Sequence, residues 1–521
     1  MSKVIDAAAA AAVIRDHQAV ASTGVIGWLT PDALLAAIGE RYEQTGSPRE
    51  LTFYFPVGTG DAVGIPGMDH VAKKGLMRRV VSGSYINPKH PVTGQRPALM
   101  ELIQNDLIEA YSWPIGATMH WLREVARQSP GYLTRIGLGT YIDPRQGGGK
   151  FTTLAQDDLV EVTEFRGQEY LFYPTWPLDV GLIRASSADE DGNLSFEDQP
   201  LLSSAIALAL AVKASGGTVI AQVGKIVPRG SRAAHDVRIP GNLVDHVVVA
   251  PDELTGTDVR NDPGYLRAAP DAVAKLPRLP YGADKIVARR VAQEIPTGEV
   301  AIFGFGASSD AVLALAEDGA LDDGRLADYI FTTEHGPFGG AVMSGWQFSA
   351  NYSPEALLDG AYMFDFIDGG GCPFTALAFA QIDETGNVNV SRFGNANPGA
   401  GGFTDIAHNA RRLVFAGTLT TGGLDVDGEG GTLNIRREGK VPKFVKNVDH
   451  ITYRIADGVR DRGQQARIIT ERAVFDVTAD GLLLIEVAPG IDVRRDVLDH
   501  IGFEVRVSDQ LTTMDAALLR P

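Results

Sequence analysis

The sequence predicts an α/β protein with two tandem, related α/β domains and mostly parallel sheets. Three observations lead to this prediction: a length of 521 residues, an alternation of short β-branched runs with amphipathic stretches, and an internal similarity between the two halves. Single hydrophobic cores stop growing near about 250–300 residues, so a chain of this length divides into domains. Strands that alternate with helices are typical of parallel sheets covered by helices.

The alternation is visible in both halves of the chain. We expect strands at Leu51–Phe55, Thr218–Val223, His246–Ala250, Val300–Phe303 and Tyr329–Thr333. We expect helices at Pro31–Arg41, Leu201–Lys213, Ala283–Ile295 and Asp310–Glu317.

Three pairs of segments recur in the same order in the two halves. The pairs are 20–35 with 300–313, 189–194 with 383–388, and 244–246 with 448–450. One alternative is common turn chemistry, because Asp-Gly-Asn is a frequent turn sequence. Three pairs of similar segments in the same order favour the interpretation as two related domains.

A proline-rich segment separates the halves. Asn261–Gly282 contains four prolines and little regular periodicity, and proline removes backbone donors and fixes the backbone. We therefore predict an N-terminal domain at 1–260, a linker at 261–282 and a C-terminal domain at 283–521.

Composition narrows the function. The net charge of −18 argues against a general nucleic-acid or anionic-membrane surface, while a local positive pocket for an anionic ligand stays possible. Cys372 is the only cysteine, so neither an intramolecular disulfide nor a Cys-rich metal site can form, and a reducing cytoplasm fits. The longest apolar run, Ala205–Val212, is too short to span a bilayer.

Glu334 is the first candidate for chemistry. A β-rich run, Tyr329–Thr333, ends in this carboxylate and is followed by a glycine-rich loop. Ligands of open α/β sheets bind beyond the carboxyl ends of strands, where backbone amides of such a loop would lie near Glu334. The alternative is an ordinary surface glutamate at a strand end.

Three other glycine-rich segments are candidates for ligand contact. The turn at 303–310 can expose amides to a phosphate or an oxyanion, although the full dinucleotide fingerprint is missing. The loop at 398–406 is either a close backbone approach to a ligand or a plain loop. The segment at 143–150 carries two cations around three glycines, and is either a phosphate clamp or a solvated loop.

His335 and Cys372 suggest a base and a nucleophile, but this is the weaker interpretation. No protease-type signature surrounds them, and a single buried cysteine is usually inert. The histidines show no metal-ligand spacing, so we expect no metal site.

Taken together, these segments resemble the family I coenzyme A (CoA) transferases, in the acetate and propionate branch with fused α and β halves. The resemblance covers nearly the whole chain. Its clearest stretches are 137–150, 168–196, 216–223, 332–340, 364–371, 381–394, 401–426, 470–475 and 487–492. It implies a sugar-isomerase-like CoA-transferase fold, in which the C-terminal half carries the catalytic glutamate.

The resemblance also implies roles for individual residues. Glu334 corresponds to the glutamate that forms the glutamyl–CoA thioester, and Gly401 and Gly402 fall in the loop whose amide helps form the oxyanion hole. CoA or substrate contacts are expected at Gly304, Phe305, Gly306, Ala307, Ile115, Gly339, Gly340 and Cys372.

Two departures from the family pattern stand out. Ile115 occupies the place of a glutamine that is expected to donate a hydrogen bond to the oxyanion, and isoleucine cannot donate. The segment 372–375 replaces more aliphatic residues and a Leu-Asp pair. Both changes are expected on the acyl side of the site, where they put the usual acetate and propionate specificity in question.

The function implied is exchange of CoA between a short-chain acyl-CoA and a free carboxylic acid, by a ping-pong mechanism. CoA is a co-substrate, and no metal, nicotinamide or flavin is required. The alternatives are an acyl-CoA thioester hydrolase on the same scaffold, or a non-catalytic ligand-binding homologue. We expect a cytoplasmic homodimer or homotetramer that binds neither nucleic acid nor membrane.

Overall fold

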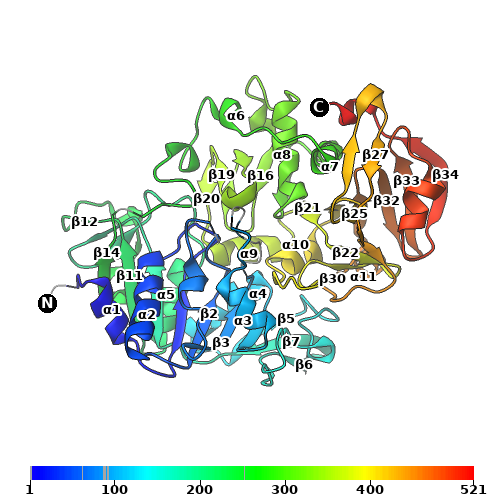
Figure 1. The fold of residues 1–521 in the computed structure, drawn as a ribbon. Helices are drawn as coiled ribbons and strands as arrows, with labels where there is room; N and C mark the ends of the chain where they lie inside the picture. The colour runs from blue at the N-terminus through cyan, green and yellow to red at the C-terminus, as the bar shows by residue number, and fades with distance from the viewer. Residues whose placement is uncertain (1–2, 62, 86–89, 91–92, 252) are drawn as a thin grey trace. The chain divides into compact units, whose positions relative to one another are not determined.

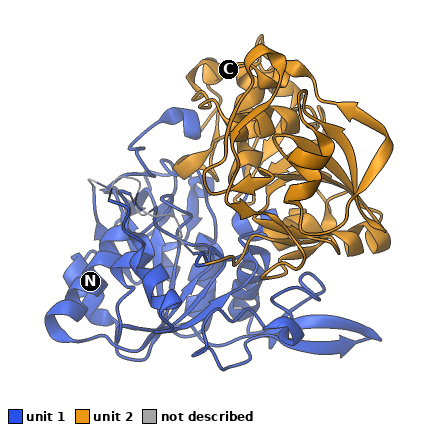
Figure 2. Cartoon of the chain, turned by 45° about the vertical axis from the view of Figure 1, so that its right-hand side comes forward, with its two compact units in different colours: residues 1–266, 357–365, 395–402 blue, residues 267–356, 366–394, 403–521 orange. Residues whose placement is uncertain are grey.

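The computed structural model describes residues 3–61, 63–85, 90, 93–251 and 253–521. These residues form two compact units, drawn in two colours in Figure 2. Unit 1 comprises residues 1–266, 357–365 and 395–402, and unit 2 comprises 267–356, 366–394 and 403–521. Two short segments from the second half of the chain therefore belong to unit 1. The domain boundaries at 260 and 283 stay a prediction.

Unit 1 is built on a seven-stranded sheet in the order β14-β11-β8-β1-β2-β3-β4, with every pairing parallel. The strands are β1 Ala19–Ser22, β2 Leu51–Phe55, β3 Met77–Ser82, β4 Glu109–Ser112, β8 Val180–Arg184, β11 Thr218–Val223 and β14 His246–Val249. Central strands such as β8 are buried along their whole length, as expected for a parallel sheet covered on both faces. The helices are α1 Ala7–Val13, α2 Asp32–Thr45, α3 Ala98–Gln104, α4 Ile115–Ala126 and α5 Ala205–Ala214 (Figure 1).

Unit 2 is built on a ten-stranded sheet in the order β20-β17-β16-β15-β21-β24-β31-β32-β33-β34. Its five-strand centre, β16 to β31, is parallel, and the flanking pairs β16–β17, β31–β32 and β32–β33 are antiparallel. The strands are β15 Val300–Phe303, β16 Ile330–Thr332, β17 Pro337–Phe338, β20 Ala356–Leu357, β21 Phe374–Ala378, β24 Arg412–Ala416, β31 Gln465–Ile469, β32 Ala473–Thr478, β33 Gly481–Val487 and β34 Arg506–Thr513.

Helices of unit 2 pack against this sheet. α7 and α8 contact each other and the strands β21, β24 and β31, whereas α11 contacts β31 and β32. The helices are α6 Ala272–Lys275, α7 Ala283–Ala292, α8 Ala307–Glu317, α10 Phe403–Asn409 and α11 Ile455–Arg462. α9 Gly360–Asp368 begins in unit 1 and ends in unit 2.

Each unit also carries a four-stranded sheet of the same construction. The orders are β12-β9-β10-β13 in unit 1 and β29-β22-β23-β30 in unit 2. In both, the first pair is parallel and the other two are antiparallel. The strands are β9 Ser187–Asp189, β10 Leu194–Ser195, β12 Lys225–Val227, β13 Val237–Ile239, β22 Gln381–Asp383, β23 Asn387–Asn389, β29 Phe444–Val445 and β30 Tyr453–Arg454.

The remaining strands form small sheets. They are β5 Gly131–Thr134, β6 Glu161–Phe165, β7 Gln168–Pro174, β18 Ala341–Val342, β19 Asn351–Tyr352, β25 Thr420–Thr421, β26 Asp425–Asp427, β27 Asn434–Arg437 and β28 Val441–Pro442.

The repeated turn sequences have the same hydrogen bonds in both units. Asp189 Oδ1 accepts from the amides of Asp191 and Asn193, and Asp383 Oδ1 accepts from those of Thr385 and Asn387. In each turn the asparagine side chain donates to the other carboxylate oxygen, at 2.8 and 3.0 Å. The parallel order β14-β11-β8-β1-β2 likewise matches β31-β24-β21-β15-β16. The prediction of two tandem, related α/β halves is confirmed.

We expect Asp383→Ala to lower the free energy of unfolding by about 1–3 kcal/mol, because it removes the buried carboxylate that accepts from the amides of Thr385 and Asn387. Denaturant or thermal unfolding measures the change. Asp480→Ala, at an exposed turn, is the matched control. Equal effects of the two substitutions would contradict the structural role of the Asp383 carboxylate.

Candidate active site

Glu334 lies in the tight turn between β16 and β17. Thr332 pairs with Phe338 across this hairpin, so that Glu334 is the second residue past the carboxyl end of β16. Thr332 Oγ1 donates to the carbonyl of Pro337 at 2.6 Å and closes the base of the turn. The parallel neighbour β15 ends at Phe303, so the turn after β15 opens at the same edge of the sheet.

The predicted glycines shape the loop that follows Glu334. Gly339 and Gly340 have φ of 75° and 66°, and a Cβ on Gly340 would lie 2.2 Å from the carbonyl oxygen of Tyr352. A side chain at 340 would therefore need both a left-handed backbone and space occupied by another backbone. Asn351 Nδ2 donates to the carbonyls of Phe331 and Gly339, which ties the strand to the loop.

The Glu334 carboxylate is buried and has few polar neighbours. Its side chain is 10% exposed, and Oε1 lies 3.3 Å from Nε2 of His335, which is 2% exposed. Within the described residues, the carboxylate accepts no hydrogen bond, and its contact with His335 is close without hydrogen-bond geometry. A carboxylate with so little solvation is destabilised in its charged form unless it is paired. This is the environment in which a weak carboxylate nucleophile becomes reactive.

The predicted turn at Gly304–Ala307 connects β15 directly to α8. Gly306 is the residue before the helix, with φ of 106°, and α8 begins at Ala307. The hydroxyls of Ser308 and Ser309 donate to the carbonyls of Gly304 and Gly306, both at 2.8 Å. The strand–turn–helix arrangement thus directs the amides of a helix start to the edge that carries Glu334.

Lys443 places a buried cation at the carboxyl ends of β21 and β24. Its ammonium lies 4.1 Å from the ring centroid of Phe379, the residue after β21, and a Cβ on Gly417, the residue after β24, would lie 2.6 Å from Nζ. The structure gives Nζ no hydrogen bond or ion pair within the described residues. Burial lowers the pKa of Lys443 to about 8. The carboxylates of Glu471 and Asp284 act in the opposite direction, so the ammonium is partly offset at longer range although it forms no ion pair.

In unit 1 the structure brings Ile115 and Gly401 together. The backbone amide of Ile115, the first residue of α4, donates to the carbonyl of Gly401 at 2.9 Å. The amide of Gly401 in turn donates to the carbonyl of Gly83 at 3.0 Å, so this amide is already engaged. The amide of Gly402, a buried residue, has no acceptor in the described chain. Of the two predicted oxyanion donors, Gly402 is the one with a free N–H.

Cys372 lies at the other edge of the unit 2 sheet. It precedes β21, whose residue Phe374 is level with Ala301, whereas Glu334 follows the carboxyl end of β16. Because these strands are parallel, the two residues are at opposite edges. Burial also raises the pKa of the Cys372 thiol to about 12. This position does not support the predicted substrate contact or a nucleophilic role for Cys372.

The cations of the 143–150 segment are paired within unit 1. Arg145 contacts Asp143 and Glu169, and Lys150 Nζ lies 2.7 Å from Asp158 Oδ1. With both charges compensated by carboxylates, this segment fits a solvated loop better than a phosphate clamp.

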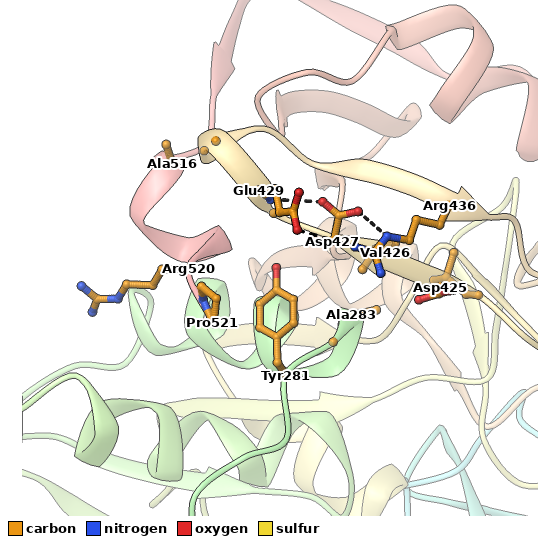
Figure 3. A pocket seen from close by; sticks show the side chains of 15 residues that line it. Tyr281, Ala283, Asp425, Val426, Asp427, Glu429, Arg436, Ala516, Arg520 and Pro521 are labelled. Carbon is orange, nitrogen blue, oxygen red and sulfur yellow. Dashed lines mark hydrogen bonds and ion pairs between the residues drawn. The ribbon is translucent and has the colours of Figure 1, made fainter.

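A cavity of about 740 Å³ lies elsewhere in unit 2, and Glu334 is not among the residues that line it (Figure 3). The hairpin β26–β27 contributes Asp427, Glu429 and Arg436, and Tyr281 faces them. Arg436 Nε contacts Asp427 Oδ2 at 2.5 Å, so these charges compensate each other. We therefore place the candidate site at the Glu334 turn.

In the described parts of the chain, no cluster of three or more His, Cys, Asp or Glu residues could hold a metal ion. The same residues contain no helix with the length and apolar character needed to cross a membrane.

Comparison with known proteins identifies the family. The Coenzyme A transferase family model matches residues 4–250. The chain is 39% identical over 496 residues to the acetate CoA-transferase YdiF of Escherichia coli K12, covering 94% of this chain and 90% of that protein. It is 36% identical to the caffeate CoA-transferase of Acetobacterium woodii, covering 99% and 97%. The chain belongs to the coenzyme A transferase family.

A solved relative shares the whole fold of this CoA-transferase. The crystal structure of the acyl-CoA transferase YdiF from E. coli O157:H7, as a thioester complex with CoA, matches with a TM-score of 0.89 at 36% identity. The match covers 100% of this chain and 96% of that one. The predicted family, fold and enzyme class are confirmed.

Sequence reasoning did not predict a buried lysine at this edge of the sheet and gave His335 little weight. Lys443 lies between Pro442 and Phe444, and nothing in that context marks its burial. His335 adjoins Glu334, but neighbours in an extended chain point to opposite faces. Only the turn between β16 and β17 brings the two side chains together.

We expect the Cys372 thiol to be unreactive in the folded transferase. With a pKa of about 12, only about one thiol in ten thousand is ionised at pH 8, and the thiolate is the nucleophile. Titration with an aromatic disulfide reagent is expected to detect no thiol in the native protein and one per chain after unfolding. Rapid labelling of the native protein would contradict the burial of Cys372.

We expect Lys443→Met to stabilise the free transferase at neutral pH. The lysine pKa is lowered from 10.5 to about 8, so the unfolded chain holds its proton where the folded chain releases it. The free-energy cost of burying the charged Lys443 ammonium is fully present below pH 8, and it decreases as the pH rises toward 10.5. It is on the order of 3 kcal/mol.

Thermal midpoints of wild type and variant between pH 7 and pH 10 measure this effect. The difference in thermal midpoint between Lys443→Met and wild type is expected to be largest near pH 7 and to decrease as the pH rises. Lys446→Met, at an exposed lysine, is the matched control. A difference in thermal midpoint that stays constant with pH would contradict the lowered pKa of Lys443.

Proposed function

We propose that this CoA-transferase moves CoA between a short-chain acyl-CoA and a free carboxylic acid through a thioester on Glu334. The observation that carries the proposal is the burial of the Glu334 carboxylate in a tight turn past the carboxyl end of β16, where His335 is its one ion-pair partner among the described residues. The thioester complex with CoA of the E. coli relative supports a covalent route.

A glutamate suits this chemistry because it conserves the energy of the thioester. The Glu334 carboxylate attacks the acyl-CoA carbonyl and expels CoA thiolate, leaving a mixed anhydride. The thiolate then attacks the glutamyl carbonyl, and the original acid departs as a carboxylate. The acceptor acid reverses these steps, which gives ping-pong kinetics. A serine ester would lose part of this activation.

Both tetrahedral intermediates need donors for their oxyanions. Gly402 supports such a role because its amide is buried and unpaired in the described chain, whereas Ile115 supplies no side-chain donor. Loss of one oxyanion donor typically costs roughly 2.7–4 kcal/mol of transition-state stabilisation. A CoA-transferase with isoleucine at 115 therefore depends more strongly on its remaining donors.

We place CoA at the unit 2 edge that carries Gly304, Phe305, Gly306 and Ala307, followed by the Gly339–Gly340 loop. The buried Lys443 ammonium at this edge, which Glu471 and Asp284 offset only at longer range, supports the binding of an anionic co-substrate. The family resemblance supports a homodimer or homotetramer, and the single cysteine is compatible with the cytoplasm.

We expect Glu334→Gln to reduce CoA exchange on the order of a thousandfold or more, since an amide cannot form the anhydride. Intact-mass spectrometry after incubation with acetyl-CoA is expected to show a CoA adduct on wild type and none on the variant. Glu504→Gln, at an exposed carboxylate before β34, is the matched control and is expected to keep both activity and adduct.

Omission of the acceptor acid separates transfer from hydrolysis. Thiol release that continues without an acceptor would favour a thioester hydrolase. Undiminished exchange by Glu334→Gln would eliminate the covalent mechanism.

A further inference from the structure

The mechanism above leaves His335 without a role, although its ring is among the most buried polar groups of unit 2. The residue is 2% exposed, and Nε2 lies 3.3 Å from Glu334 Oε1. The other ring nitrogen, Nδ1, is buried and has no hydrogen-bond partner in the described chain. A buried polar group with no partner requires a physical reason.

The fold imposes the contact between His335 and Glu334. Residues adjacent in an extended strand would direct their side chains to opposite faces. Here Gly336, with φ of 105°, and the hydrogen bond of its amide to the carbonyl of Thr333 at 3.3 Å bend the chain between β16 and β17. The imidazole is thereby held against the carboxylate, not against solvent.

Hydrogen-bond chemistry assigns the proton on the ring. An ionised carboxylate only accepts hydrogen bonds, so the nitrogen facing Oε1 must be the donor. A proton on Nδ1 would add a buried N–H with no acceptor, which is costly. The neutral imidazole with its proton on Nε2 satisfies both conditions.

We propose that His335 is a catalytic hydrogen-bond donor that acts on the Glu334 carbonyl throughout the reaction. This inference rests on the proposed glutamyl–CoA mechanism. In the resting enzyme Nε2 lies 3.3 Å from Oε1 without forming a hydrogen bond, and its N–H engages Oε1 as charge develops there, so that Oε2 is the oxygen that attacks the acyl-CoA. Oε2 becomes the bridging oxygen of the anhydride, and Oε1 stays as the glutamyl carbonyl oxygen.

The donor then acts in the second step. The CoA thiolate attacks Cδ of Glu334, and the carbonyl electron pair moves onto Oε1, which becomes an oxyanion facing Nε2–H. When the carbonyl re-forms, the bond from Cδ to Oε2 breaks, and Oε2 leaves with the acyl group as a carboxylate. No proton is transferred, so His335 donates a hydrogen bond and remains neutral.

The resting distance sets the expected size of the effect. The contact of 3.3 Å does not have hydrogen-bond geometry in the resting structure, and catalytic hydrogen bonds are often long or poorly aligned before charge develops on the acceptor. Removing one oxyanion donor costs about a hundredfold to a thousandfold in well-aligned sites. We therefore expect a loss of about tenfold to a hundredfold here.

Two substitutions separate donation from packing. His335→Leu keeps an apolar side chain of similar size and removes the donor, whereas His335→Gln keeps an N–H within reach of Oε1. The measurement is the single-turnover rate of glutamyl–CoA formation from acetyl-CoA, by rapid quench and intact-mass spectrometry, together with steady-state kcat and KM. His120→Leu, at a buried histidine in α4, is the matched control.

We expect His335→Leu to slow adduct formation and kcat by about tenfold to a hundredfold with little change in KM for acetyl-CoA, and His335→Gln to recover most of the rate. The control is expected to keep the wild-type rate. The proposal is overturned if His335→Leu forms the adduct within about twofold of the wild-type rate. It is also overturned if His335→Gln folds but forms the adduct as slowly as His335→Leu. If the Leu variant does not fold, His335→Met replaces it with the same thresholds.

Failure of the underlying mechanism has a different signature. Wild-type protein that exchanges CoA but never carries the adduct would overturn the Glu334 thioester, and this inference with it. An adduct that forms at the wild-type rate in His335→Leu overturns only the role of His335.

Discussion

The number of hydrogen bonds that a buried carboxylate accepts determines whether it stabilises this fold or reacts. Asp383 accepts from three backbone amides, a hydroxyl and an asparagine amide, so its charge is fully compensated. Glu334 is buried to a similar degree but has one contact, at 3.3 Å. A carboxylate in that state is poorly solvated and poorly paired, and attack on a carbonyl relieves this condition. The tight turn around Glu334 holds the carboxylate in this unfavourable environment.

Strands that are buried on both faces could be predicted from the local sequence. The predicted strands at Leu51–Phe55, Thr218–Val223 and Val300–Phe303 coincide with β2, β11 and β15, because parallel strands buried on both faces give continuous apolar runs. The first residues of the helices were predicted less accurately. α8 begins at Ala307, three residues before the predicted Asp310, because Gly306 supplies the residue before the helix.

The site was only partly predictable for a related reason. Glu334 could be recognised because a strand end followed by glycines is a local pattern. The burial of Lys443 depends on Phe379 and Gly417, which lie far away in sequence, and the position of Cys372 at the edge opposite Glu334 becomes visible only from the register of β21. The attachment of segments 357–365 and 395–402 to unit 1 likewise has no local signal, since it is a long-range packing choice.

The duplication shows why position alone does not create a nucleophile. In the matching sheet orders β2 of unit 1 corresponds to β16 of unit 2, and each strand leads into a glycine-containing loop with a buried carboxylate. In unit 1 that carboxylate is Asp61, whose Oδ1 accepts from the amides of Val63, Gly64 and Ile65, while Oδ2 accepts from Thr257. Its lone pairs are occupied, so it holds a loop in place. Asp61 lies six residues past the end of β2, whereas Glu334 lies two residues past the end of β16 and has one contact in the described chain, with an imidazole. The two related halves therefore differ in the donors placed around the acid, and those donors, more than the fold, assign the chemistry to Glu334.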